Sequence, residues 1–243
     1  MQRSMHRPME SSGVQSSGVS RGVSGASLTL RAAASALRAR VVFGGPVCCV
    51  RRALPPDVED AAAFLAEQCF PAFDGVLGPD ADILRHAAPY LTSPRQQSLR
   101  REVDAAVAAF RSVTRASAPR VVFGIVDTDS CRKLHVDYIA LRMVSTFHGP
   151  GTEWAEEAAV DRVALAELAE DPDEANRRIV RDPSLIRRCQ PGDWLFMKGE
   201  AWPGQSGHGA VHRSPPVEHE RKRRLVLVLT LPRSRARASE PHD

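Results

Sequence analysis

The stretch KLHVDYIALRMVSTF, residues 133–147, decides the fold class. It is rich in β-branched and aromatic residues, which favour extended structure. Three further runs have the same character and are bounded by Gly, Pro or Asp: RVVFGIVDTDS (120–130), DWLFMKG (193–199) and RRLVLVLTL (223–231). We therefore expect residues 119–232 to form a sheet or barrel, interrupted by a helix at about 153–170 and a short helical segment near 173–181.

The chain before these strands has a helical pattern. Apolar residues recur at helical spacing in DVEDAAAFLAEQCF (57–70), ADILRHAAPYL (81–91) and RQQSLRREVDAAVAAFRSVTRAS (95–117). Helices that precede a run of strands indicate an α+β fold. We expect a helical N-terminal layer, residues 41–118, that supports the β domain.

The two ends of the chain differ in texture from its body. Residues 1–40 are rich in Ser, Gly and Arg, and we expect them to be a disordered tail, although LTLRAAASALRAR at their end is helical in character. A targeting segment or a misassigned start site would have the same composition. Residues 233–243 are expected to form a second disordered tail.

The composition is that of a globular chain without a membrane or nucleic-acid partner. Hydrophobic residues are 43% of the 243, which excludes disorder of the whole chain, and no apolar run approaches the ~20 residues of a membrane helix. The net charge of +4 comes from the two ends, and the RKRR cluster at 221–224 has no interleaved aromatic residues. Five cysteines without a CxxC pair indicate a reducing compartment, so we expect a soluble, cytoplasmic protein.

His135 and Asp137 are the first candidates for a chemical site. They lie two residues apart in a predicted strand, so their side chains point to the same face and can bind one ion. His212 is the best placed third ligand, with His208 in the same Gly-rich segment as the alternative. Two histidines and one carboxylate on one side of a metal form the facial triad of non-haem Fe(II) oxygenases.

The residues around this triad resemble those of the Fe(II)/2-oxoglutarate dioxygenases, which have a double-stranded β-helix (jelly-roll, cupin-like) core. The order is HxD, the turn PGD (191–193) before a strand, then His212, and Arg223 and Arg224 at the start of an apolar strand. The resemblance implies that Fe(II) is held by the triad and that the late arginine binds the distal carboxylate of 2-oxoglutarate. An arginine fork suits a carboxylate. Arg224 is favoured because it adjoins the apolar strand, but which of the two faces the pocket stays open.

A closer resemblance, from about residue 120 to 231, is to an uncharacterised bacterial family of unknown function with HxD, GPGTEW, KGE and HRSP motifs. The motif residues suggest further contacts with a substrate: Thr152, Glu153, Trp154, Lys198, Glu200 and Arg213. The resemblance also implies a link with zinc homeostasis and leaves the substrate open.

Three functions follow as hypotheses. The first is an Fe(II)/2-oxoglutarate-dependent oxygenase with a small-molecule co-substrate. The second is a cupin-like metal-binding protein without redox chemistry, because zinc takes the same ligands. The third is an interaction module, which predicts that no pocket brings His135, Asp137 and His212 together. Ligating atoms more than about 6 Å apart would contradict both metal hypotheses, since bonds to such metals are about 2.0 to 2.2 Å long.

Overall fold

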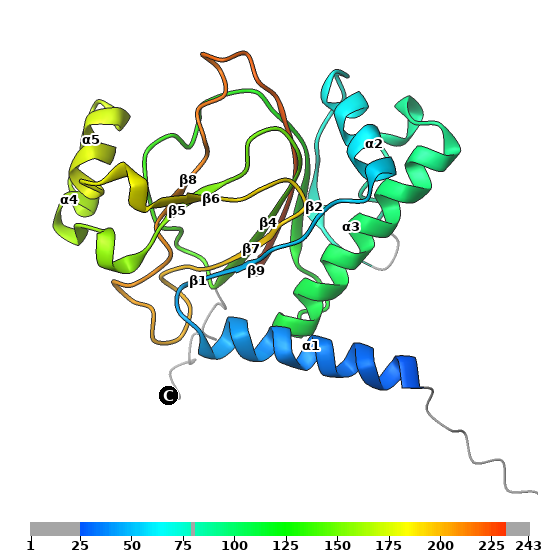
Figure 1. Cartoon of the computed structure of the whole chain (residues 1–243), viewed down its shortest axis with the longest axis horizontal. Helices are drawn as coiled ribbons and strands as arrows, with labels where there is room; N and C mark the ends of the chain where they lie inside the picture. The colour runs from blue at the N-terminus through cyan, green and yellow to red at the C-terminus, as the bar shows by residue number, and fades with distance from the viewer. Residues whose placement is uncertain (1–24, 79–80, 232–243) are drawn as a thin grey trace, which may run out of the picture.

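The computed structural model describes residues 25–78 and 81–231, and Figure 1 shows their arrangement. The helices are α1 (Gly25–Phe43), α2 (Pro56–Ala66), α3 (Ser93–Thr114), α4 (Arg162–Ala166) and α5 (Pro172–Ile179). The strands are β1 (Val47–Val50), β2 (Phe73–Val76), β3 (Arg120–Val126), β4 (Leu141–His148), β5 (Glu153–Ala155), β6 (Ile186–Arg188), β7 (Trp194–Lys198), β8 (His212–Arg213) and β9 (Arg224–Leu231). None of the described helices is both long and apolar enough to cross a membrane.

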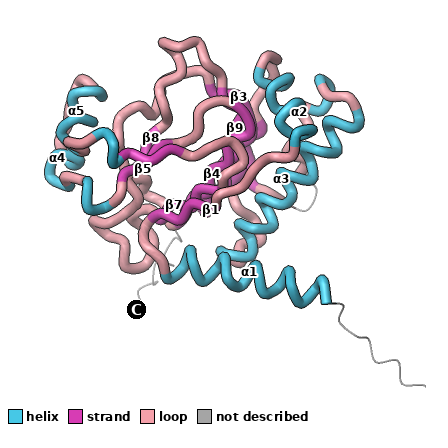
Figure 2. The backbone as a smooth tube through the Cα atoms, in the orientation of Figure 1, coloured by secondary structure: helices cyan, strands magenta, loops and turns pink. Residues whose placement is uncertain are grey.

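The strands form two antiparallel sheets that face each other (Figure 2). The large sheet has the order β1-β7-β4-β9-β3-β2, and the small sheet has the order β6-β5-β8. An isolated bridge between His135 and His212 adds one further residue pair beside β8. The space between the two sheets holds the candidate site described below.

The order of the segments is that of a jelly roll. Eight segments follow one another along the chain: β3, the bridged residue His135, β4, β5, β6, β7, β8 and β9. The first, third, sixth and eighth of them, β3, β4, β7 and β9, form the centre of the large sheet. The other four, His135, β5, β6 and β8, form the small layer. A chain that alternates in this way between two facing antiparallel sheets is a double-stranded β-helix. The predicted α+β fold with a jelly-roll core is therefore confirmed.

The alternation of side chains along β9 gives the large sheet two different faces. Leu225, Leu227 and Leu229 are buried against the helical layer, because successive residues of a strand point to opposite sides. Helix α2 contacts β4 and β9, and α3 contacts β9, so these two helices cover that outer face (Figure 1). The other face, with Arg224 and Val226, looks toward the small sheet.

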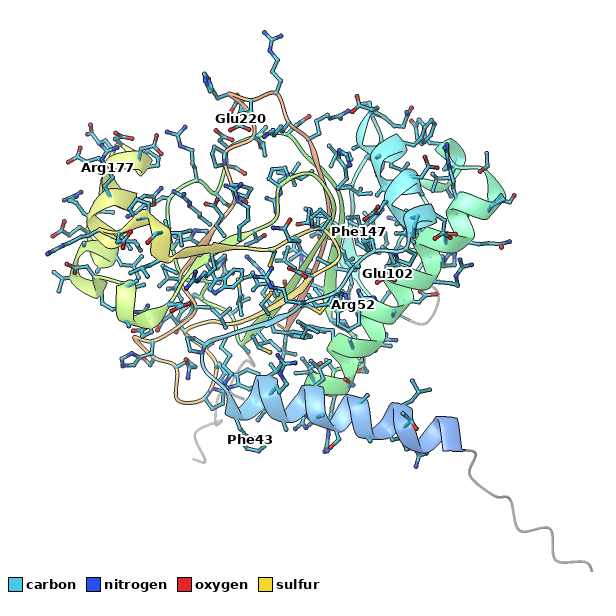
Figure 3. All side chains as sticks on the ribbon, viewed as in Figure 1. Phe43, Arg52, Glu102, Phe147, Arg177 and Glu220 are labelled. Atoms are coloured by element: carbon cyan, nitrogen blue, oxygen red, sulfur yellow. The ribbon has the colours of Figure 1, made fainter. Side chains whose placement is uncertain are left out.

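Arg52 ties the segment after β1 to the helical layer. Its Nη1 lies 2.5 Å from a carboxylate oxygen of Glu102 on α3, and the two side chains are labelled in Figure 3. The guanidinium also lies 4.0 Å from the ring centroid of Trp194 and donates to the Gly192 carbonyl. Phe147, labelled in the same figure, is buried in the core between the large sheet and the helices.

Helix α1 corrects part of the expected N-terminal tail. Residues 25–40, expected to be disordered, belong to a helix that runs to Phe43. It is held by tertiary contacts: Val41 is buried, Leu37 packs on the core, and the Arg38 guanidinium donates to the Val113 carbonyl of α3. Residues 1–24 and 232–243 lie outside the described part of the chain, so the expectation of disorder there stays untested.

The segment 41–118 is not purely helical. It supplies β1 and β2, the two edge strands of the large sheet, which sequence patterning missed because each has four residues and no clear alternation. The helix expected over 81–91 is a series of turns with a 3-10 helix at Ala88–Tyr90, where Pro89 removes a backbone donor.

The prediction of a helix over residues 153–170 was also wrong for the first part of that range. Residues 153–155 form β5, because Glu153 pairs across the sheet with arginines of β6 and β8 and Trp154 is buried between the sheets. The helix begins only at Arg162, after Asp161 caps its first turn.

Candidate active site

The structure brings His135, Asp137 and His212 together. One ligating atom of each lies within 4.8 Å of the others, so the prediction of the interaction-module hypothesis that these residues stay apart is wrong. The His135 and His212 backbones exchange two hydrogen bonds of 3.0 Å, which fixes one imidazole beside the other. The ring centroids are 4.5 Å apart.

Asp137 is positioned by the loop after β7, and the KGE motif explains how. The Glu200 amide donates to the Asp137 carbonyl at 3.0 Å, and the Gly199 amide donates to Ala140 at 3.1 Å. A Cβ at Gly199 would lie only 2.5 Å from the Asp137 carbonyl oxygen, so glycine is needed for this close approach. The motif therefore acts on the site through its backbone.

Both imidazoles present the same ring nitrogen to the centre of the site. His135 Nδ1 lies 2.8 Å from the Lys133 carbonyl and His212 Nδ1 lies 3.0 Å from the Ala210 carbonyl. A carbonyl oxygen only accepts, so each Nδ1 carries a proton, and in the neutral form of each ring the Nε2 atom has a lone pair. Metal-binding histidines are held in this way by a hydrogen bond from the other ring nitrogen.

The Asp137 carboxylate faces one of these lone pairs. Its Oδ2 lies 3.3 Å from His212 Nε2 and 2.6 Å from Arg142 Nη1, yet it is buried and has no hydrogen bond of acceptable geometry. Two acceptor atoms at 3.3 Å repel each other unless a cation or a proton lies between them. The donor set of two imidazoles and one carboxylate therefore fits a divalent metal such as Fe(II) or Zn(II).

The ionisation of the group also suits a metal. Burial, followed by the nearby His212, lowers the pKa of His135 and keeps this imidazole neutral at neutral pH. Burial alone would raise the pKa of Asp137, but His212 and Arg142 outweigh it and hold that pKa below its ordinary value. Metal ligands must be deprotonated, and both residues are so at neutral pH.

Arg224 lies in the same cavity as a buried cation without a counterion. The residue is 3% exposed, and no carboxylate of the described residues lies within 4.0 Å of its guanidinium. Nη2 donates to the hydroxyls of Thr152 at 3.1 Å and Thr146 at 3.4 Å, while Nε has no partner. Burial lowers the pKa of Arg224 to about 10. A buried guanidinium in this state is a site for an anionic ligand.

The cavity that joins these groups lies between the two sheets. Its volume is about 160 Å³, which suits a ligand smaller than a drug-sized molecule. Side chains from both sheets line it: Val126, Cys131, His135, Arg142, Val144, Thr152, His212, Arg213, Ser214, Arg224, Val226 and Val228. The lining thus combines polar groups, among them both histidines and Arg224, with valines from the large sheet.

The choice between Arg223 and Arg224 is decided by the alternation along β9. Arg224 shares a strand face with Val226 and Val228, which line the cavity. Arg223 is on the opposite face, lines a different pocket, and its Nε lies 3.7 Å from Asp127 Oδ2. The expectation that Arg223 could serve the same pocket is therefore corrected. The regular spacing of leucines at alternate positions of this strand could have settled the choice from sequence.

The GTEW residues are divided among different roles. Thr152 lines the cavity and holds Arg224. Glu153 is buried and forms ion pairs with Arg188 and with Arg213, the latter at 2.7 Å, so its carboxylate is already neutralised. Trp154 packs in the core between the sheets. Of the residues suggested to contact substrate here, Thr152 and Arg213 reach the cavity.

Lys198, Glu200 and His208 lie outside the cavity. Lys198 Nζ donates to the Val42 and Gly44 carbonyls at the end of α1, at 3.1 and 2.7 Å. The Glu200 carboxylate accepts from two backbone amides of its own loop. The His208 side chain is 69% exposed and is not part of the His135 group. These placements correct the suggested substrate contacts of Lys198 and Glu200 and exclude His208 as the third ligand.

The sequence predicts a surface or ion-paired role for Arg142, on the strand face opposite His135. The ion pair is confirmed, with Asp137 as the partner, but the predicted face is wrong. A regular strand over 133–147 would put it on the face opposite His135, but the chain bends at residues 138–140 and passes from the small layer to the large sheet. His135 and Arg142 therefore face each other across the cavity. No local pattern in YIA marks this crossing.

The comparisons with known proteins concern most of the chain. The model of a family described as "Protein of unknown function (DUF1826)" matches residues 34–230. No curated protein matches the chain. Among solved structures, the rice dioxygenase for auxin oxidation is similar at 13% identity, 86% coverage of this chain and 80% of that chain, with a TM-score of 0.47.

Two further solved structures are similar at the same low identity. The Fe(II)/(alpha)ketoglutarate-dependent dioxygenase TqaL is 13% identical over 89% of this chain and 94% of that chain, with a TM-score of 0.47. A Pseudomonas putida prolyl-4-hydroxylase is 13% identical over 83% and 95%, with a TM-score of 0.39. A shared substrate or activity does not follow from likenesses of this size.

Proposed function

The chain belongs to this family of proteins of unknown function, and we propose that it is a non-haem oxygenase that uses Fe(II) and 2-oxoglutarate. One observation carries the proposal: the His135–Asp137–His212 group and the unpaired Arg224 guanidinium share one small cavity. A metal-binding group alone would not require a buried cation, and a buried anion site alone would not require the metal ligands.

His135, Asp137 and His212 would hold the metal, and bound Fe(II) would supply the redox chemistry that activates O₂. The protein's own part is to keep His135 and Asp137 deprotonated and to orient all three ligands. The carbonyls of Lys133 and Ala210 fix the two rings. The ligands come from two separate segments of the chain, around residues 135–137 and at residue 212, so the group exists only in the folded protein.

Arg224 and Thr152 would bind the distal carboxylate of 2-oxoglutarate. The guanidinium has a free Nε–H, and a carboxylate can accept from a guanidinium at two points. Val226 and Val228 line the cavity beyond Arg224 and can contact the methylene groups of the co-substrate. Because the cavity is narrow and its walls are valines, they also exclude water from the charged pair and so strengthen it.

Arg142 would act as a positioning residue for Asp137. Its Nη1 lies 2.6 Å from Asp137 Oδ2, on the cavity side of the carboxylate, and the positive charge favours the ionised form of that ligand. It also leaves a second guanidinium in the cavity, at the end opposite Arg224, which suits a ligand with two carboxylates.

The alternative of a zinc-binding cupin uses the same three ligands and differs at Arg224. A metal-binding protein without a co-substrate gains nothing from a buried arginine that has no counterion, because burying an unpaired charge costs stability. The state of Arg224 therefore favours the oxygenase.

An anaerobic titration tests the proposal. Full-length protein loaded with Fe(II) should develop a weak visible charge-transfer band when 2-oxoglutarate is added. Arg224→Ala should bind iron and give no band, whereas the matched control Arg223→Ala, changed at the neighbouring arginine outside the cavity, should give the wild-type band. Absence of the band from well-folded, iron-loaded wild-type protein would overturn the co-substrate assignment.

A further inference from the structure

A second reactive group lies beside β1 and β6, and neither of its two cysteines lines the cavity. Cys49 is on β1, the edge strand of the large sheet, and Cys189 directly follows β6, the edge strand of the small sheet. Their Sγ atoms are 3.9 Å apart, although 139 residues of chain separate them. All five cysteines of the chain are free thiols in this structure.

The carboxylate beside this pair is already fully used by the protein. Asp193 accepts hydrogen bonds from the Arg51 guanidinium at 2.7 Å and from the backbone amides of Arg52 and Gln190 at 3.0 and 2.8 Å. A divalent metal at Cys49, Cys189 and Asp193 would have to displace these donors and would lie against a guanidinium. The environment therefore favours thiol chemistry over a metal site, although the three side chains are close enough to ligate one.

The two thiols differ in a way that assigns them different roles. The contact between the two thiols lowers the pKa of Cys49 and outweighs burial and the Asp193 carboxylate, which raise it. The same contact, with burial, raises the pKa of Cys189. Cys49 is partly exposed and lines a surface groove beside the end of α1, whereas Cys189 is 4% exposed. A thiolate that solvent can reach, next to a cation such as Arg51, is the reactive member of such a pair.

We propose that Cys49 and Cys189 form a peroxide-reactive dithiol that closes reversibly to a disulfide. The Cys49 thiolate attacks one oxygen of hydrogen peroxide, the O–O bond breaks, and Cys49 becomes a sulfenic acid. The hydroxide that leaves takes up the proton released when the Cys49 thiol ionised, which gives one water. Cys189 sulfur then attacks Cys49 sulfur, the S–O bond breaks, and its proton leaves with the hydroxide as a second water. Two thiols lose two electrons and one peroxide gains them.

The geometry needs little change for this reaction. A disulfide has a sulfur–sulfur distance of about 2.05 Å, so the two sulfurs must approach by roughly 2 Å, which rotation about the Cα–Cβ bonds of two facing side chains supplies. The new bond would join β1 to the segment after β6, and hence the large sheet to the small one. No step of this reaction uses the metal-ligand group or Arg224.

Peptide mapping of the full-length chain tests the proposal directly. Reduced protein is treated with one equivalent of hydrogen peroxide in the presence of a chelator that keeps adventitious iron from producing radicals, and the remaining thiols are then alkylated. We expect two of the five thiols to be lost, a peptide pair linked through Cys49 and Cys189 to appear, and dithiothreitol to restore both thiols.

Variants separate the two roles. Cys189→Ser should accumulate a sulfenic acid at Cys49 that dimedone traps, and Cys49→Ser should lose the linked peptide. The control is Cys69→Ser, which removes an exposed thiol outside the pair and should behave as wild type. The mapping of the wild-type chain stands even if a variant fails to fold.

Two results would overturn the proposal. One is oxidation of Cys69 or Cys131 by the first equivalent of peroxide with no Cys49–Cys189 bond. The other is protection of both Cys49 and Cys189 from alkylation by one equivalent of zinc in the reduced protein, which would make the pair a metal site.

Discussion

Replacing Arg224 by methionine should strongly weaken 2-oxoglutarate binding and at the same time stabilise the ligand-free protein. The two effects have opposite signs because the arginine is held, before any ligand arrives, in a place that suits only a bound anion. Its pKa of about 10 compares with roughly 12.5–13.8 for an exposed arginine, and each tenfold change in that protonation equilibrium is about 1.4 kcal/mol. Burial of the charge therefore costs on the order of 3 kcal/mol.

Methionine fills a similar volume without the charge, and it also forfeits the hydrogen bonds to Thr152 and Thr146. We expect a net gain of about 1–3 kcal/mol in the free energy of unfolding, or a rise of roughly 2–10 °C in Tm for a chain of this size. Loss of a charge-assisted carboxylate contact that leaves the ligand's charge buried costs about 2–5 kcal/mol, so the dissociation constant should rise at least ~30-fold.

The assay is calorimetric titration of 2-oxoglutarate into protein loaded with Mn(II), a redox-inert substitute for Fe(II), together with thermal unfolding in a buffer free of carboxylates and phosphate. Arg223→Met is the matched control and should leave both quantities near wild type. A variant at Arg224 that is less stable than wild type would make the arginine a structural residue. Undiminished 2-oxoglutarate affinity would refute its role as the anchor.

Three further predictions concern other parts of the chain. The pKa of His135 is lowered in the folded protein, so the unfolded chain takes up the proton first as the pH falls. Metal-free protein should therefore lose free energy of unfolding as the pH falls through about 6.5, measured by urea unfolding at a series of pH values. His135→Gln should flatten this part of the series. Lys198→Met should lower the free energy of unfolding by about 1–3 kcal/mol and speed proteolysis within α1, because it removes donors from the carbonyls at the end of that helix, while a 2-oxoglutarate titration stays unchanged; a changed affinity would return Lys198 to the site. Gly151→Ala should destabilise the protein strongly in thermal unfolding, because the new Cβ would overlap the Cys189 carbonyl oxygen, and an unaffected Tm would show that this contact is not tight.

The sequence predicted best those features that follow from residue type and spacing alone. The spacing of His135 and Asp137, the distant His212 and an arginine at the start of an apolar strand were enough to propose which residues meet. The α+β class followed from the order of helical and extended patterns. The class of a helix or strand depends on the pattern of several neighbouring residues, so the local sequence is sufficient to predict it.

The parts that failed depend on tertiary contacts. The crossing of the chain between the two layers at residues 138–140 moved Arg142 into the cavity, and no residue there requires it. The KGE motif was read as two side chains that contact substrate, whereas its effect on the site comes from backbone amides and from the missing Cβ of Gly199. Cross-strand ion pairs at Glu153 overrode a helical pattern in the same way.

The most direct test of the central claim is anomalous X-ray diffraction from crystals grown anaerobically with Fe(II) and 2-oxoglutarate. The account predicts one iron peak bound by His135, Asp137 and His212, with the distal carboxylate of 2-oxoglutarate on Arg224. Iron bound elsewhere, or density for 2-oxoglutarate that does not contact Arg224, would contradict it.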